Sequence, residues 1–289
     1  MEELIEKARV LQESLPYIRR FHGRTFVIKY GGSAMIDPAL QESFVRDVVL
    51  MKYVGMNPVV VHGGGPQIDE TLRGLGIAPQ KVEGLRITDD RTMAVVEMVL
   101  AGSINKRIVS LLDRHGGRAV GLSGIDGGLL FANKAPPIQT KSGPVDPGRV
   151  GEIREVRTAV LTALIGAGFI PVIAPLGLDA EGNTLNINAD TAAGEIAAAL
   201  KAEKLVLMTD TKGVCDRGGE LLASLTAASI AQLRAAEVIT GGMIPKVECA
   251  LSALSGGVNK VHVLDGRVQH AILLEIFTDR GIGTEILRG

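Results

Sequence analysis

Short apolar runs alternate along almost the whole chain with longer segments in which apolar residues recur every three or four positions. Runs rich in Val, Ile and Leu that end at glycine or polar residues predict buried strands, and the longer period predicts helices that pack by one face. The predicted strands are 25–30, 58–62, 118–122, 169–174, 204–208, 260–264 and 284–287, and the predicted helices are 39–55, 66–75, 89–114, 155–167, 189–201, 226–236, 243–255 and 268–277. This alternation predicts an α/β fold, a three-layer αβα sandwich with a mostly parallel central sheet.

Three segments depart from this alternation. Residues 3–20 have helical spacing ahead of the first strand, and Pro16 within them is expected to kink or break the helix. Residues 124–153 are rich in Gly and Pro and predict hairpins, and a further hairpin near 178–187 has Gly182-Asn183 at its turn. With a lobe boundary at that hairpin, the expected parts are an N-terminal helical extension over 1–24, an N-lobe over 25–180 and a C-lobe over 181–289.

Composition narrows the class of protein. The 289 residues are 46% hydrophobic but only 3% aromatic, with no Trp, so Ala, Val, Leu and Ile must build the core. A net charge of −1 gives no general electrostatic case for nucleic acid or membranes. Cys215 and Cys249 have neither metal-ligand nor redox spacing. With an acidic N-terminus, no signal-peptide pattern and no apolar stretch near the roughly 20 residues of a membrane helix, we expect a soluble cytoplasmic protein.

Two glycine runs end hydrophobic strands. One is Phe26-Val-Ile-Lys-Tyr-Gly-Gly32 and the other is Val59-Val-Val-His-Gly-Gly-Gly65. Glycine lets backbone N–H groups approach an anion closely because no Cβ intervenes. Lys29 lies two residues before the first pair of glycines. Two such loops predict a substrate with charge at two places, such as a carboxylate and a phosphate.

Several common site types are absent from the sequence. Gly is nowhere followed by Lys, which excludes a Walker-type P-loop, and no G-x-G-x-x-G supports a dinucleotide oxidoreductase. There is no H-E-x-x-H, no cysteine cluster for zinc and no G-x-S-x-G elbow. Polar segments instead follow predicted strands or open predicted helices, at 186–190, 209–214 and 240–246. In open α/β sheets, ligands bind beyond the carboxyl ends of the strands.

Together these segments resemble the amino-acid kinase superfamily, and within it the N-acetylglutamate kinase branch, over nearly all of the chain. The residues that carry the resemblance are Lys29-Tyr-Gly-Gly, His62-Gly-Gly-Gly, Gly84-Leu-Arg-Ile-Thr88, Asn186-Ile-Asn-Ala-Asp190, Thr209-Asp-Thr-Lys-Gly213 and Thr240-Gly-Gly-Met243 with Lys246. The double glycines are shared across the superfamily, whereas the third and fourth segments point to the acetylglutamate branch. The resemblance implies ATP-dependent phosphorylation of the γ-carboxylate of N-acetyl-L-glutamate, a step of arginine biosynthesis.

The physical chemistry suits such a reaction. A γ-carboxylate has a reference pKa of about 4.3, so at neutral pH it is already an anion and needs no general base. The difficulty is to bring it up to an anionic phosphoryl group, which calls for positive charge and N–H donors. Two lysines and glycine loops provide these groups.

The resemblance assigns roles to individual residues. Lys29, Lys246 and Asp190 would be catalytic, with both lysines beside the transferring phosphoryl group and Asp190 holding them. Substrate-binding residues would be Gly64, Gly65, Arg86 and Asn186, with Arg86 on the α-carboxylate. Nucleotide-binding residues would be Lys29, Gly31, Gly32, Thr209, Asp210, Gly213, Val214, Val238, Thr240 and Lys246. Mg²⁺ would arrive on the ATP phosphates, and no metal ligands from the protein are expected. The N-lobe would bind acetylglutamate and form the dimer, and the C-lobe would bind ATP.

The arginine-inhibited members of the branch share two further features with this chain. They have a helix before the first strand, and they have a C-terminal pattern like His262-Val-Leu-Asp-Gly … Leu274-Glu-Ile-Phe-Thr-Asp-Arg-Gly-Ile-Gly-Thr284. The resemblance implies a hexamer, a trimer of dimers linked by the leading helices. It also implies feedback inhibition by L-arginine. The expected arginine site consists of Tyr17, His262, Glu275 and Gly281.

Other readings stay open on the sequence alone. A kinase for acetylaminoadipate or for carrier-linked glutamate would share the glycine loops and differ in the substrate pocket. A non-catalytic arginine-sensing protein could use the same fold, although Lys29, Asp190 and Lys246 are all present. A PII-type regulatory partner is neither predicted nor excluded.

Overall fold

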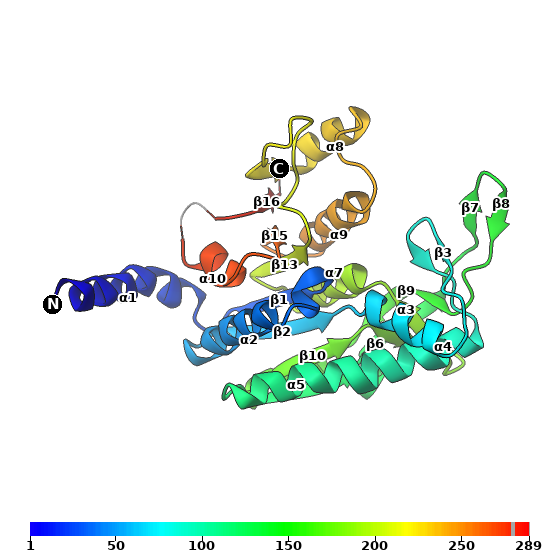
Figure 1. Ribbon diagram of the computed structural model, residues 1–289, viewed down its shortest axis with the longest axis horizontal. Helices are drawn as coiled ribbons and strands as arrows, with labels where there is room; N and C mark the ends of the chain where they lie inside the picture. The colour runs from blue at the N-terminus through cyan, green and yellow to red at the C-terminus, as the bar shows by residue number, and fades with distance from the viewer. Residues whose placement is uncertain (279–280, 289) are drawn as a thin grey trace.

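A central sheet with helices on both faces forms the body of the protein in the computed structural model, which describes residues 1–278 and 281–288 (Figure 1). In spatial order the strands are β14 (Ser224–Thr226), β16 (Thr284–Leu287), β15 (Lys260–Asp265), β13 (Lys204–Thr209), β1 (Thr25–Tyr30), β2 (Asn57–His62), β10 (Ile170–Ala174) and β5 (Ala119–Ser123). All neighbours are parallel except β15 and β16. This confirms the predicted α/β fold with a mostly parallel sheet.

Alternating residues of β1 show how the two helical layers are held. Phe26 and Ile28 are fully buried in the core on one face, with residues of α2, α5 and α10, whereas Val27 lies in the core on the other face, with residues of α7 and α9. A central parallel strand is buried on both faces, which explains its unbroken apolar run. The helices are α1 (Glu2–Phe21), α2 (Pro38–Tyr53), α3 (Gly65–Gly74), α4 (Asp90–Glu97), α5 (Asn105–Arg114), α6 (Ala159–Gly166), α7 (Ala189–Ala199), α8 (Ala227–Ala235), α9 (Met243–Ser255) and α10 (Ala271–Ile276).

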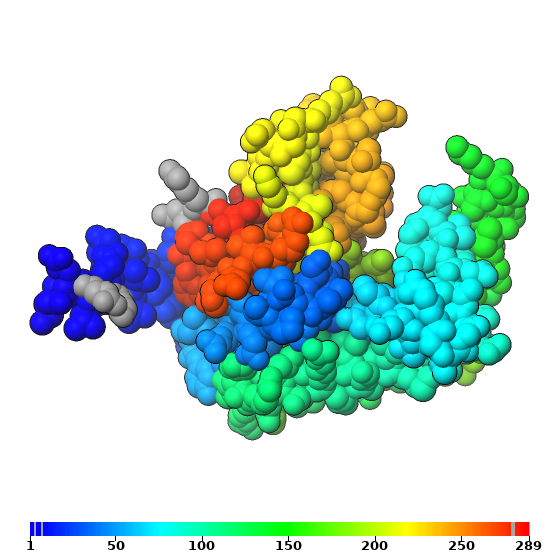
Figure 2. All heavy atoms as spheres, in the orientation of Figure 1, coloured from blue at the N-terminus to red at the C-terminus, as the bar shows by residue number. Residues whose placement is uncertain are grey.

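Shorter strands build a second sheet, whose hairpin of β11 (Leu176–Leu178) and β12 (Thr184–Ile187) confirms the hairpin predicted near 178–187, although its closure into a barrel was not predicted. The strands close into a small barrel in the order β11, β12, β9 (Val150–Val156) and β6 (Leu130–Lys134). Two hairpins project beside it, β3 (Lys81–Val82) with β4 (Leu85–Arg86) and β7 (Ile138–Thr140) with β8 (Gly143–Val145). In Figure 2 these hairpins stand apart from α8 and α9, and the surface is hollowed between them.

Two predicted helices differ from those in the structure. The segment 89–114 is not one α-helix, because a π-helical stretch, η2 (Met98–Ile104), separates α4 from α5. Pro16 does not break α1, which runs without interruption from Glu2 to Phe21. Most of α1 is exposed, so water can bind the carbonyl that loses its partner to the proline.

The predicted helix at 155–167 also starts later, at Ala159, since β9 continues to Val156. The other helices and the predicted strands of the central sheet lie within a few residues of their predicted ranges, whereas the edge strand β14 was not predicted. Among the described residues no helix has the length and apolar character needed to cross a membrane.

Candidate active site

Asp190 lies between two lysines, and we call these three residues the Asp190 cluster. Its Oδ1 is 3.0 Å from Nζ of Lys29, and its Oδ2 accepts a 2.7 Å hydrogen bond from Nζ of Lys246. The three side chains are only 11–14% exposed. Ion pairs with this little water contact are screened weakly, so the charges act strongly on one another and on any bound ligand.

Three separate elements supply the Asp190 cluster. Lys29 is the penultimate residue of β1, Asp190 lies in the first turn of α7, and Lys246 lies in the first turns of α9. Asn188 caps α7, since its Oδ1 accepts from the backbone N–H groups of Asp190 and Thr191 at 2.8 and 3.1 Å. The cap fixes the start of the helix, and the helix dipole favours a carboxylate there.

Asp190 is ionised in this environment. Burial by itself would raise the pKa of its carboxyl group, but attraction to Lys29 and Lys246 and their hydrogen bonds outweigh burial and hold the pKa below its usual value. Two ammonium groups around one carboxylate leave one excess positive charge. The cluster can therefore attract a further anion while Asp190 continues to hold both lysines.

Glycine is required beside these charges. A Cβ on Gly31 would lie 2.8 Å from Nζ of Lys29 and would push the ammonium away from Asp190. Gly32 has a φ of +69°, and a Cβ there would lie 2.6 Å from a carboxylate oxygen of Asp210. That carboxylate accepts a 2.8 Å hydrogen bond from the backbone N–H of Ser33. The end of β13 is thereby tied to the loop after β1.

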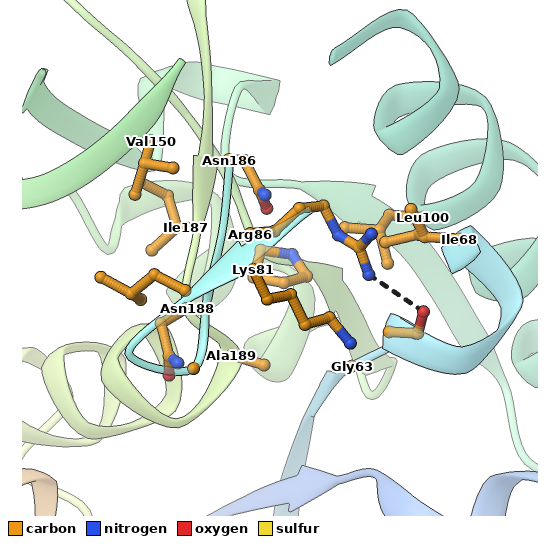
Figure 3. A pocket seen from close by; sticks show the side chains of 15 residues that line it. Gly63, Ile68, Lys81, Arg86, Leu100, Val150, Asn186, Ile187, Asn188 and Ala189 are labelled. Carbon is orange, nitrogen blue, oxygen red and sulfur yellow. Dashed lines mark hydrogen bonds between the residues drawn. The ribbon is translucent and has the colours of Figure 1, made fainter. Parts of the chain in front are cut away.

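A pocket of about 220 Å³ lies next to the Asp190 cluster (Figure 3). Gly63 connects the two, because its N–H donates to the Tyr30 carbonyl at 2.8 Å and a Cβ on it would touch the Cβ of Ala189. Ala189 directly precedes Asp190. The pocket is lined by Gly63, Gly64, Gly65, Ile68, Lys81, Gly84, Leu85, Arg86, Leu100, Val150, Pro175, Asn186, Ile187, Asn188 and Ala189.

Arg86 is the buried cation of this pocket. Its side chain is 7% exposed, its Nη1 is 2.5 Å from Oδ1 of Asp69, and its Nη2 donates to the Gly65 carbonyl at 3.1 Å, the bond dashed in Figure 3. Lys81 donates to the other oxygen of Asp69 at 2.8 Å. Burial would raise the pKa of Asp69, but the hydrogen bonds from Lys81 and Arg86 outweigh it and lower that pKa. We call Asp69, Lys81 and Arg86 the Asp69 cluster.

The glycine loop after β2 runs along the pocket wall and opens α3. A Cβ on Gly64 would come within 2.5 Å of Ile104 and 2.6 Å of Leu100. Both belong to the π-helical stretch, where an extra residue per turn changes the direction of the side chains. Close packing thus explains glycine at position 64. On the opposite wall, Asn186 donates to Oγ1 of Thr88 at 3.2 Å.

The residues predicted to bind nucleotide lie at the ends of C-terminal elements. Thr209 ends β13, and Gly213 has a φ of +145° that allows the backbone of Val214 to donate to Oγ1 of Thr284 at 2.8 Å. Val238 is half-buried and Thr240 is exposed, both between α8 and α9.

Three of the four residues predicted for the arginine site come together in the structure. Nδ1 of His262 is 2.6 Å from Oε1 of Glu275, both side chains are nearly fully buried, and a Cβ on Gly281 would lie 2.8 Å from Oε2 of Glu275. Tyr17 lies on α1, edge-on to the ring of Phe277 with centroids 6.3 Å apart. Asp279 and Arg280 of the C-terminal pattern lie outside the described residues.

Comparison with known proteins assigns the chain to a family. The model of the Amino acid kinase family matches residues 24–265. An acetylglutamate kinase of Geotalea daltonii is 58% identical over 290 residues, and one of Aquifex aeolicus is 59% identical over 295 residues, each covering 99% of both chains. The chain belongs to the amino acid kinase family, among the acetylglutamate kinases.

Solved structures agree with this family. The N-acetylglutamate synthase of Neisseria gonorrhoeae, complexed with coenzyme A and N-acetyl-glutamate, matches with a TM-score of 0.85 and 31% identity. The match covers 98% of this chain but only 63% of the synthase chain. The carbamate kinase of Giardia lamblia bound to AMP-PNP has a TM-score of 0.67 over 92% of this chain and 99% of its own. At 16% identity, that likeness concerns the fold alone.

The sequence analysis missed Lys81, which lines the pocket, and Asp69, which pairs with Lys81 and Arg86 of the lining. Asp69 lies in the middle of α3, where an acidic residue on a helix is ordinarily a solvated one. Lys81 precedes the Gly-Leu-Arg-Ile-Thr motif by three residues and belongs to no motif. The available signal was an acidic residue four positions beyond the glycine run, on the face of α3 next to buried Ile68 and Leu72.

Proposed function

We propose that this protein transfers the γ-phosphoryl group of ATP to the γ-carboxylate of N-acetyl-L-glutamate, forming N-acetyl-L-glutamyl 5-phosphate in arginine biosynthesis. The observation that carries the proposal is the buried Asp190 cluster beside a pocket with a buried arginine, in a chain 56–59% identical to acetylglutamate kinases.

Lys29 and Lys246 stabilise the charge of the transferring phosphoryl group. The substrate carboxylate attacks in its ionised form, so no general base is required. Asp190 touches both lysines and fixes the distance between them. Catalysis then rests on position and electrostatics, which act most strongly where water is excluded.

The pocket binds N-acetyl-L-glutamate. The guanidinium of Arg86 holds the α-carboxylate, and Asn186 binds nearby through its amide group. Gly64 and Gly65, at the N-terminus of α3, offer N–H groups to the γ-carboxylate end. The pocket contains one buried arginine and adjoins the Asp190 cluster, so a substrate with two carboxylates spans it naturally.

ATP binds over the hollow between α8, α9 and the hairpins. Gly31 and Gly32 contact its phosphates, and the remaining contacts come from Thr209, Asp210, Gly213, Val214, Val238 and Thr240. Within residues 1–278 and 281–288 no group of three or more acidic, His or Cys side chains could hold a metal ion. We propose that Mg²⁺ is bound mainly by ATP phosphates and water, as this ion prefers.

We further propose a division into lobes, with 1–24 as an assembly and regulatory helix, 25–180 binding acetylglutamate and 181–289 binding ATP. Exposed apolar side chains on α1 support assembly into a hexamer, since Leu4 is 61%, Leu11 72% and Leu15 52% exposed. A helix that leaves such residues in water gains by packing on another subunit. Size measurement in solution tests this assembly.

L-Arginine is the proposed inhibitor. It would bind between α1 and α10, where a pocket is lined by Glu13, Pro16, Tyr17, Arg20, Phe277 and Thr278. Of the four residues predicted for the arginine site, Tyr17 lines this pocket, whereas the buried carboxylate of Glu275 already pairs with His262 and does not line it. In support, the gonococcal synthase structure that matches this chain with a TM-score of 0.81 is complexed with coenzyme A and L-arginine.

The test is ADP formation from MgATP with and without N-acetylglutamate, repeated with N-acetylaminoadipate and with millimolar arginine. We expect turnover that requires acetylglutamate, is weak with the longer acid and falls with arginine. Turnover only with acetylaminoadipate would overturn the proposed substrate. Turnover unchanged by arginine would show that arginine is not an inhibitor, while the assignment as a kinase would stand.

A further inference from the structure

Asp69 is the common partner of both cations that face the substrate pocket. It receives a bond from Lys81 at 2.8 Å and lies 2.5 Å from Arg86, and its side chain is only 13% exposed. Asp69 belongs to α3, the helix that begins at the glycine loop, whereas Lys81 and Arg86 belong to the hairpin β3–β4. One carboxylate therefore ties the hairpin to the helix across the pocket.

Apart from the Asp69 ion pairs, the hairpin is held to the glycine loop by the bond from Arg86 Nη2 to the Gly65 carbonyl. Each of its strands is two residues long, and Lys81 pairs directly with Arg86. The turn residues Glu83 and Gly84 have φ values of +47° and +82°, which is strained for a glutamate. Isolated two-stranded hairpins are marginally stable in water, so contacts with the rest of the protein must fix this one.

We propose that Asp69 is a positioning residue for substrate capture, which holds the β3–β4 hairpin against α3 and aims the guanidinium of Arg86 into the pocket. Asp69 does not touch the substrate in this account; it acts through Arg86 and Lys81. The identity of the captured ligand, a small dicarboxylate, rests on the proposed function.

If net charge alone sets binding, loss of the Asp69 carboxylate should have the opposite effect on substrate binding to the effect expected if Asp69 positions Arg86. Lys81 and Arg86 with Asp69 give the pocket one net positive charge, and Asp69→Asn would raise it to two. If charge alone decided binding, the variant would bind an anionic substrate more tightly. If Asp69 positions the guanidinium, the variant binds the substrate more weakly despite the added positive charge.

Steady-state kinetics of Asp69→Asn distinguish an effect of charge from an effect of positioning. We expect KM for acetylglutamate to rise at least about tenfold, the loss that follows from one misplaced charge-assisted contact. We expect kcat and KM for ATP to change less than about twofold, because the Asp190 cluster is untouched. Glu70→Gln, which removes an exposed carboxylate from the next position of α3, is the matched control and should leave all three constants unchanged.

A KM for acetylglutamate that stays the same or falls in Asp69→Asn would overturn the proposal. So would a loss confined to kcat. Lys81→Met gives an independent arm, since it breaks the exposed half of the cluster and leaves Asp69 and Arg86 in place. A smaller rise in KM is expected there, with recovery in Lys81→Arg; no recovery would count against positioning through Asp69.

Hydrogen exchange of the backbone amides of 81–86 tests the hairpin without any turnover. Exchange should speed up at least about threefold in Asp69→Asn relative to wild type and Glu70→Gln, as local opening becomes easier. Equal exchange in all three proteins would overturn the proposal. Should the wild type not turn over acetylglutamate, the proposed function fails, whereas this measurement still decides the role of Asp69.

Discussion

The Asp190 cluster and the Asp69 cluster share one design, a carboxylate between two cations. The ion-pair distances are similar, 3.0 and 2.7 Å around Asp190 and 2.8 and 2.5 Å around Asp69. The supports differ. The first cluster joins a central strand to two long helices with every side chain at most 14% exposed, whereas the second includes a short hairpin whose Lys81 is 47% exposed.

This difference matches two different tasks. Phosphoryl transfer tolerates little displacement of the groups that meet the transition state, so its cations belong on a packed sheet edge. Substrate capture requires entry and exit, and loosely packed segments open locally at low cost in free energy. Under the proposed function, the same arrangement of charge serves a rigid catalytic centre and an adaptable binding pocket.

The largest expected effect comes from Asp190→Asn. Two buried ammonium groups then face each other without a carboxylate, and we expect kcat to fall at least about 100-fold, equivalent to about 2.7 kcal/mol in the barrier. Glu195→Gln on the same helix is the control, and its kcat should remain near that of the wild type. A decrease in kcat of less than about threefold in Asp190→Asn would show that the cluster is not catalytic.

Exchanging lysine for arginine at one position of each cluster sharpens the comparison. Lys246→Arg must fit a larger planar group into a buried site, so we expect kcat to fall about tenfold. Lys81→Arg changes a half-exposed side chain and should alter kcat and KM less than about twofold. Steady-state rates of both variants measure this, and equal sensitivity at the two positions would contradict the contrast in rigidity.

A smaller effect concerns the stability of the fold and comes from His62, the last residue of β2. This ring is fully buried, with Nδ1 2.9 Å from the Gly63 carbonyl and Nε2 3.2 Å from the Asn105 amide. Burial lowers the pKa of His62 to about 4 from 6.5, although the bond to Gly63 opposes it. The folded protein therefore binds fewer protons than the unfolded chain, so stability is full above pH 6.5 and is lost as the pH falls toward 4.

Denaturant unfolding at pH 8 and pH 5.5 measures this effect. His62 should contribute about 1.4 kcal/mol to the loss of unfolding free energy over that interval. In His62→Gln the loss should shrink by that amount, whatever the absolute stability of the variant. A wild type and a variant with identical pH dependence would contradict a neutral buried ring.

The sequence predicted the central sheet well because its strands are buried on both faces and end at glycine or polar residues. The strands predicted at 58–62 and 284–287 lie at Asn57–His62 and Thr284–Leu287. Within the small barrel the β11–β12 hairpin was predicted, but the closure was not, because strands such as β11 and β6 are short and pair across large separations in sequence. The π-helical stretch also left the apolar period nearly unchanged, so 89–114 looked like one helix.

The candidate site also contains residues that the sequence predicted and residues that it did not. Lys29, Asp190 and Lys246 were singled out through motifs at strand ends and helix starts. In the structure, Nζ of each lysine lies within 3.0 Å of a carboxylate oxygen of Asp190. Asp69 was missed because its importance arises only when the β3–β4 hairpin folds back over α3. Motifs report what contacts the ligand, whereas tertiary contacts decide what holds those residues in place.

The most direct test compares wild type, Asp190→Asn and Asp69→Asn in one ADP-formation assay with varied acetylglutamate. We predict that Asp190→Asn loses kcat while its KM for acetylglutamate stays within about threefold of wild type, and that Asp69→Asn does the reverse. If both variants lost the same kinetic parameter, the separation between a rigid catalytic cluster and a positioning cluster for capture would be wrong.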